Sequence, residues 1–194
     1  GLALSSRNAR LSEEERVKAA NIHKILEQST TMHIDAGFVE KMVFSIIKWM
    51  LENDIVKNIP TGKLMVSLSD DERKCFDVFI NSNLLIQHDS PEREEGTDEI
   101  INFAFEEVRD YLIARYLITD GLNGDAEKYK GYLQKYTNGS NNLAEGIRHY
   151  LFLIARNSEN NQVIESFKDQ PWYDETKIYG IWEVNSNKLT DEDV

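Results

Sequence analysis

Side chains that could carry out nucleophilic or metal-assisted chemistry are few and scattered in this 194-residue sequence. The one cysteine, Cys75, has no histidine near it in the sequence, which favours a buried structural thiol over a nucleophile. The histidines show no H-E-x-x-H spacing and have no cysteine partners, so we predict no metal site. They are His23, His33, His88 and His149.

The sequence also predicts no glycine-rich loop for binding a nucleotide. Such a loop needs the pattern G-x-x-x-x-G-K-[ST], because backbone amides and a lysine must surround the phosphates. The Gly62-Lys63 pair has Lys57 where the first glycine belongs and Leu64 where the hydroxyl residue belongs. We therefore predict an ordinary loop here and no catalytic residue in the chain.

The charged residues between 106 and 110 could have a specific role. Glu106 and Asp110 are four residues apart, a like-charge spacing that destabilises a helix unless a cation lies between them, and Arg109 is one available cation. The simplest interpretation of Glu106 and Glu107 is that acidic residues favour the start of a helix. For Asp110, which begins an apolar stretch, we predict a structural hydrogen bond to a neighbouring element.

Composition limits the classes of function. The formal charge of -12 argues against a surface for nucleic acid, which would need clustered Lys and Arg. No apolar run approaches the length of a membrane span or resembles a signal peptide, and a single cysteine cannot form an internal disulfide. These features predict a cytoplasmic location without a membrane partner. The start at Gly1-Leu2, without methionine, predicts a fragment of a longer protein.

Helical periodicity and capping residues predict the elements of the first half. A capping box of Ser12 and Glu15 predicts a helix over about 13–28, and a second box of Ser69 and Glu72 predicts one over about 70–81. Between them, residues 37–54 carry one broad apolar face, and residues 60–62 are expected to form the loop that ends that helix. The apolar face comprises Val39, Met42, Val43, Ile46, Ile47, Met50 and Leu51.

The period then changes to that of β-strands. Residues 84–88 and 100–105 predict a hairpin with a long acidic tip, and the second strand should place Ile101, Phe103 and Phe105 on one side. Helices followed by such a hairpin are in the order of a winged helix.

The helix expected from Glu106 has no polar stripe after Tyr111 except at Arg115, so we predict that it is buried on all sides, as a joint between two bodies. The residues after it predict further helices, which could begin an α-solenoid although no repeat period is found. The predicted fold class is therefore mainly α: a winged-helix domain with a two-stranded β-hairpin, then a helical segment. The predicted parts are 1–35 (helix and linker), 36–119 (winged helix and joint helix) and 120–194 (helical segment with a disordered acidic tail).

Residues 36–119 resemble the winged-helix region of STAND-class NTPases, the NACHT-like signalling ATPases that include bacterial antiviral defence proteins. The resemblance rests on Leu84-Leu85-Ile86, a variable wing, Phe103, and a helix with an acidic residue, an aromatic residue, Leu-x-Ala. Where many family members carry a phosphate-sensing histidine, this sequence has Phe105, as in a bacterial subgroup with F-x-aromatic-E followed by R-D-Y. The residues that match the family motif, expected at an interdomain contact, are Phe103, Phe105, Glu106, Arg109, Asp110, Tyr111, Leu112 and Ala114.

The resemblance implies a non-catalytic regulatory fragment that couples a C-terminal ligand sensor to a nucleotide-binding domain elsewhere in the protein. It implies ATP and Mg²⁺ in the longer protein but no cofactor in this fragment, and an oligomer on activation. The alternative from another class is a winged-helix DNA-binding regulator. It is disfavoured because the segment 70–81 has four acids against two bases, and the predicted wing has six against one.

Overall fold

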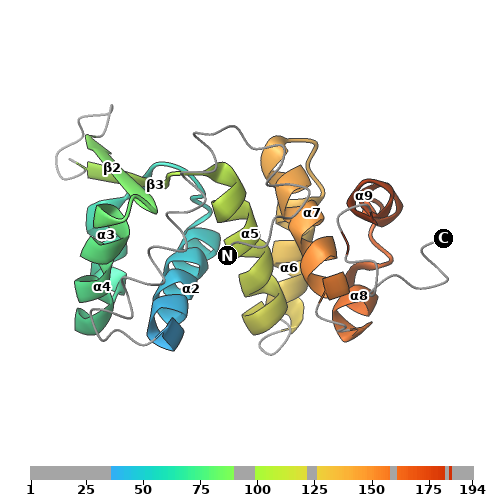
Figure 1. The fold of residues 1–194 in the computed structure, drawn as a ribbon, viewed down its shortest axis with the longest axis horizontal. Coiled ribbons are helices and arrows are strands. Elements are labelled where there is room, and N and C mark those ends of the chain that lie inside the picture. The colour runs from blue at the N-terminus through green and yellow to red at the C-terminus, as the bar shows by residue number, and fades with distance from the viewer. Residues whose placement is uncertain (1–35, 90–98, 122–125, 158–160, 182–183, 185–194) are drawn as a thin grey trace, which may run out of the picture. The chain divides into compact units, whose positions relative to one another are not determined.

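The computed structural model describes residues 36–89, 99–121, 126–157, 161–181 and 184. It is mainly helical, with a small three-stranded antiparallel sheet (Figure 1). The chain divides into two compact units, residues 1–105 and residues 106–194, and each is described by itself. The predicted helix over 13–28 and the acidic tail lie outside the described residues, and the predicted partition at residue 119 stays a prediction.

The first unit contains α2 (Ala36–Asn53), α3 (Thr61–Ser67) and α4 (Asp70–Asn81) with a sheet of three short strands. All seven residues predicted for the apolar face of α2 are buried, and Met42, Ile47 and Met50 are fully buried. Periodicity is reliable here because an 18-residue helix with a continuous apolar stripe has only one way to remove that stripe from water.

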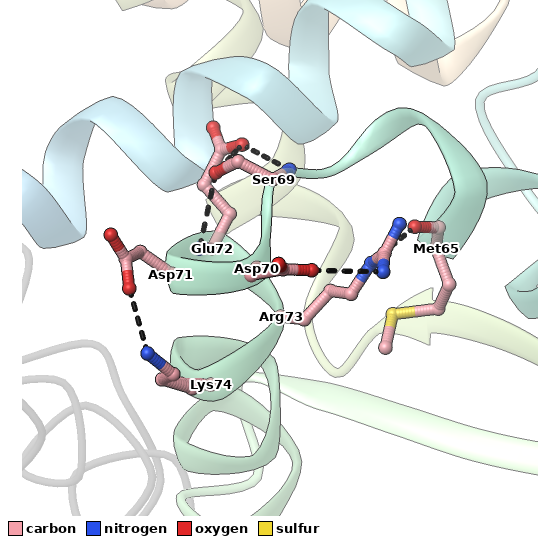
Figure 2. Close-up of polar contacts among 7 residues, drawn as sticks. All are labelled: Met65, Ser69, Asp70, Asp71, Glu72, Arg73 and Lys74. Atoms are coloured by element: carbon pink, nitrogen blue, oxygen red, sulfur yellow. Dashed lines mark hydrogen bonds and ion pairs between the residues drawn. The ribbon is translucent and has the colours of Figure 1, made fainter.

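The capping box that starts α4 is confirmed. The Ser69 hydroxyl accepts from the Glu72 amide, while the Ser69 backbone amide donates to the Glu72 carboxylate over 2.8 Å (Figure 2). The other Glu72 oxygen accepts from the hydroxyl of Ser45 on α2, so the cap also connects the two helices. Burial opposes ionisation of Glu72, but the hydrogen bonds from Ser45 and Ser69 together bring its pKa below the ordinary value.

The sheet has the strand order β1 (Ile59–Pro60), β3 (Glu99–Phe103), β2 (Leu85–Asp89). The predicted hairpin is confirmed, with Leu85 opposite Phe103, but the third strand was not predicted because two residues carry no period. Ile59 of β1 lies opposite Ile101 of β3, and both are fully buried. Because β3 is the central strand, Ile100 on its other face is buried too.

The loop predicted at residues 60–62 is wrong. Pro60 belongs to β1 and also precedes the first residue of α3, while Gly62 and Lys63 lie in the first turn of that helix. Proline fits both positions, because it lacks an amide hydrogen and its fixed φ suits a sheet edge or a helix start. The connection from α2 turns at Asp54 and Asn58, whose φ angles of 58° and 51° lie in the left-handed region.

The second unit contains α5 (Glu106–Tyr116), a π-helical turn η1 (Leu117–Gly121), α6 (Ala126–Thr137) and α7 (Asn142–Asn157), followed by α8 (Asn161–Phe167) and α9 (Tyr173–Gly180). The helices predicted after residue 120 are confirmed. From Tyr111 to Ile118 no side chain of α5 and η1 is exposed, although Tyr111, Leu112 and Arg115 are only half-buried. The interpretation of α5 as a joint between two bodies stays a prediction.

Aromatic side chains and one buried hydroxyl fix the far end of this unit. Trp172 stacks on Phe167 with ring centroids 5.6 Å apart, and its indole N–H donates to the Thr137 hydroxyl over 2.9 Å. That hydroxyl in turn donates to the Leu133 carbonyl, so the polar group of Trp172 is satisfied in a buried position. The end of α6 is thereby connected to the start of α9.

Candidate functional site

The candidate site is built around a buried ion pair on α5. Arg109 and Asp110 are 3% and 5% exposed, and the guanidinium binds Asp110 Oδ1 through Nε at 2.9 Å and Nη2 at 2.8 Å. Both contacts go to the same carboxylate oxygen. The exposed Glu106 lies farther from the guanidinium, at 3.9 Å from Nη1, so Asp110 is the main counter-ion of Arg109.

The second carboxylate oxygen of Asp110 faces α7 at Gly146. A Cβ atom built on Gly146 would lie 2.3 Å from Asp110 Oδ2 and 3.2 Å from Asp110 Cβ. The glycine therefore lets α5 and α7 approach closely enough to bury the carboxylate. The predicted role of Asp110 as a polar residue set against a neighbouring element agrees with this geometry, although the contact is close packing against a glycine.

Burial raises the pKa of Asp110 from 3.8 to about 6, although the hydrogen bond and the charge of Arg109 favour the ionised form. The negative charges of Glu106 and Glu107 add to the increase. A raised pKa can indicate a functional site, but buried structural ion pairs show the same effect. Here the carboxylate is enclosed by Arg109 and Gly146, which indicates a structural role.

Aromatic rings continue this contact along α5 and α7. Tyr111 and Tyr150 meet edge to face with centroids 5.7 Å apart, and Arg115 donates from Nη1 to the Tyr111 hydroxyl over 3.3 Å. Ile113 and Ala114 are fully buried beside them. The predicted motif residues on α5 thus take part in helix packing within the second unit.

The eight motif residues do not form one cluster in a single unit. Phe103 ends β3 and Phe105 follows it, and both are half-buried in the first unit. The other six lie on α5 in the second unit, where Leu112 is half-buried and Ala114 is fully buried. The residue that sequence reasoning missed is Gly146, whose signal was a lone glycine inside a helical pattern.

The remaining chemical candidates also have structural positions. Cys75 is 4% exposed on α4, and burial, followed by the nearby charge of Asp71, raises the pKa of its thiol. The predicted structural thiol agrees with this position. Of the histidines, His88 lies on β2 and His149 on α7, while His23 and His33 are outside the described residues.

The charged start of α4 shows no free cationic surface. Arg73 pairs with Asp70 at 3.2 Å and also donates to the Met65 carbonyl, while Lys74 pairs with Asp71 at 2.8 Å (Figure 2). Both cations are thus engaged by groups of the same unit.

The comparisons with known proteins give one match. A family model described as pantoate-beta-alanine ligase matches residues 1–78. No curated protein and no solved structure matches the chain. Within the described residues, no helix is long and apolar enough to cross a membrane.

The family match contradicts the resemblance to STAND-class NTPases and the antiviral signalling function inferred from it. It also contradicts the alternative of a DNA-binding regulator. The misleading signal was a short motif around α5. Its central residues, Arg109 and Asp110, are explained by the packing of α5 on α7, so their spacing does not require a signalling family.

Proposed function

We propose that this chain is part of a ligase related to pantoate-beta-alanine ligase, and that its described residues form a non-catalytic helical part of that protein. The observation that carries the proposal is the family match over residues 1–78. The family name describes a ligase of pantoate, a carboxylate, and beta-alanine, an amine. Because a free carboxylate does not react readily with an amine, such a reaction requires activation, and ATP with Mg²⁺ remains the proposed cofactor pair of the longer protein.

The assignment of a non-catalytic role rests on what the chemically capable groups do in the fold. Arg109 and Asp110 neutralise each other inside the second unit, and Cys75 is buried with a raised pKa. Lys63 lies in the first turn of α3, where its Gly62 neighbour is part of a helix and cannot form a phosphate-enclosing loop. These positions support a binding or packing role for residues 36–181.

We also infer the finer fold from the order of elements. In the first unit α3 and α4 precede the β2–β3 hairpin, the order of a winged helix, and the acidic α4 suits contact with protein better than contact with nucleic acid. The helices of the second unit could begin a solenoid. The proposed partner is the remainder of the same ligase-related protein.

Two measurements test these two claims separately. The complete 194-residue chain, supplied with pantoate, beta-alanine, ATP and Mg²⁺, should form no amide product by mass spectrometry, while an authentic pantoate-beta-alanine ligase in the same buffer provides the positive control. Calorimetry should show no binding of ATP with a dissociation constant in the low micromolar range, about −8 kcal/mol. Product formation or such binding would overturn the non-catalytic assignment.

The relation to the ligase is tested on the gene. The reading frame upstream of the codon for Gly1 should encode residues that extend the match to the same family model. An upstream sequence that matches an unrelated family would refute the ligase relation while leaving the non-catalytic assignment intact.

A further inference from the structure

A cleft between α7 and α9 in the second unit has the size and lining of a small-molecule site. Its volume is about 310 Å³, at the lower end of the usual range for ligand pockets. The α7–α9 cleft is lined by Glu145, Arg148 and His149 from α7 and by Glu175, Thr176 and Tyr179 from α9.

Close packing at one end of α9 holds the two helices at this separation. A Cβ atom on Gly180 would lie 2.6 Å from Phe152 Cδ1, so only a glycine lets the end of α9 rest on the buried Phe152 ring of α7. At the other end Trp172, directly before α9, is buried against Phe167. The cleft is therefore formed by helices that are fixed at both ends of α9.

One side of the lining is suited to a cation. Glu145 and Glu175 come from different helices and face the same cleft, and within the described part of the chain neither carboxylate has an ion-pair partner. Thr176 is 8% exposed, and among the described residues its hydroxyl has no hydrogen-bond partner. Two carboxylates and a hydroxyl can accept the three N–H bonds of a primary ammonium group, which would also reduce the repulsion between the two acids.

The other side is suited to an anion. Arg148 Nη1 donates to the carbonyl oxygens of Thr137 and Gly139, each over 3.0 Å, and these contacts fix the guanidinium at the end of α6. Three of its five N–H donors belong to Nη2 and Nε, and a guanidinium fork is well suited to a carboxylate. His149 lines the same cleft beside it.

We propose that the α7–α9 cleft binds a small zwitterion of the amino-acid class, with its ammonium at Glu145, Glu175 and Thr176 and its carboxylate at Arg148. The exposed Tyr179 ring, 71% accessible, lies at the mouth of the cleft and can cover the bound ammonium. This site lies outside the residues matched by the ligase family, so the inference does not depend on the proposed function.

The test uses the complete chain and four probes. Glycine and 4-aminobutyrate are zwitterions of two lengths, while acetate and ethylamine each carry only one of the two charges. By calorimetry or ligand-observed NMR we expect at least one zwitterion to bind saturably below about 1 mM, a modest affinity of about −4 kcal/mol. Both single-charge probes should bind at least about tenfold more weakly, a factor worth about 1.4 kcal/mol.

Two variants and a matched control assign the binding to the cleft. Glu175→Gln should weaken zwitterion binding about tenfold, and Thr176→Val, which keeps the buried shape, should weaken it several-fold. Asp174→Asn removes the same charge from the neighbouring exposed position of α9, which does not line the cleft, and should leave binding unchanged. Circular dichroism verifies that each variant is folded.

Several outcomes would overturn the proposal. They are the lack of saturable zwitterion binding at 10 times the expected constant, equal binding of ethylamine or acetate, and an equal loss in Asp174→Asn and Glu175→Gln. If Glu175→Gln fails to fold, the comparison of Thr176→Val with Asp174→Asn decides the assignment.

Discussion

Replacing Gly146 by alanine should destabilise the second unit, although alanine is the better helix former. In the centre of a helix this change alone stabilises by about 1 kcal/mol. At Gly146 the new methyl group would lie 2.3 Å from Asp110 Oδ2 and 3.0 Å from its Cγ. Asp110 is short, 5% exposed and bound to Arg109, so it cannot move aside as a long surface side chain would.

The magnitude follows from these opposing effects. Overpacking a close contact costs about 1 to 3 kcal/mol, and the helical preference of alanine offsets part of that. We therefore expect Gly146→Ala to lower the free energy of unfolding by about 1 to 2 kcal/mol. Urea unfolding, followed by the fluorescence of buried Trp172 and by hydrogen exchange of amides in α5 and α7, measures the effect in the second unit.

Gly131 provides the matched control. It lies inside α6, and nothing stands within 4 Å of where its Cβ would be, so Gly131→Ala should stabilise by about 0.5 to 1 kcal/mol. In an Asp110→Ala background the obstructing carboxylate is gone, and Gly146→Ala should then become neutral or stabilising. If Gly146→Ala stabilises the protein as much as Gly131→Ala does, or costs the same with and without Asp110, the close α5–α7 contact is refuted.

Three further predictions follow from the same structure. Because the pKa of Asp110 is raised to about 6 in the folded chain, its contribution to stability is present below pH 4 and is lost as pH rises through 6; the stability of Asp110→Asn relative to the unsubstituted chain should therefore rise from pH 4 to 7, by at most about 3 kcal/mol in urea titrations. Cys75 should react with a thiol reagent at least about tenfold more slowly than a free thiol at pH 8, and equal rates would show that its burial is wrong. Because Arg73 and Lys74 are paired with acids of α4, fluorescence anisotropy should show no binding to duplex DNA at about 100 μM protein, and a salt-sensitive signal below about 10 μM would contradict this.

The elements that could be predicted were those whose signals are local or strongly periodic. The apolar stripe of α2 and the Ser69–Glu72 capping box each depend on residues within a few turns, and both are present as predicted. The strand β1 could not be predicted, because Ile59 and Pro60 are extended only through pairing with β3, more than 40 residues later. Gly62 then looked like a loop residue, since nothing local shows that a helix begins after Pro60.

The candidate site was predicted only in its polar half. Arg109 and Asp110 were recognisable because charge is rare in an apolar stretch, but the partner of Asp110 is a glycine, which has no chemical group to signal contact. The α7–α9 cleft was missed for a related reason. Its acidic lining residues, Glu145 and Glu175, are on helices separated by α8, and each alone is an ordinary exposed acid.

The family match and the folded unit have different boundaries, and this determines how the ligase relation must be tested. The match ends at residue 78, inside α4, whereas β1 within the matched part pairs with β3 outside it, with Ile59 opposite Ile101. Both isoleucines are fully buried, so removing residues after 78 would expose Ile59 and cut α4 before its buried Phe79. Burial of such side chains contributes about 2 kcal/mol each, a large fraction of the stability of a small domain. A polypeptide ending at residue 78 would therefore fail for reasons of folding alone, and any loss of function in it would say nothing about the matched residues. The ligase relation has to be tested in a chain that retains β3.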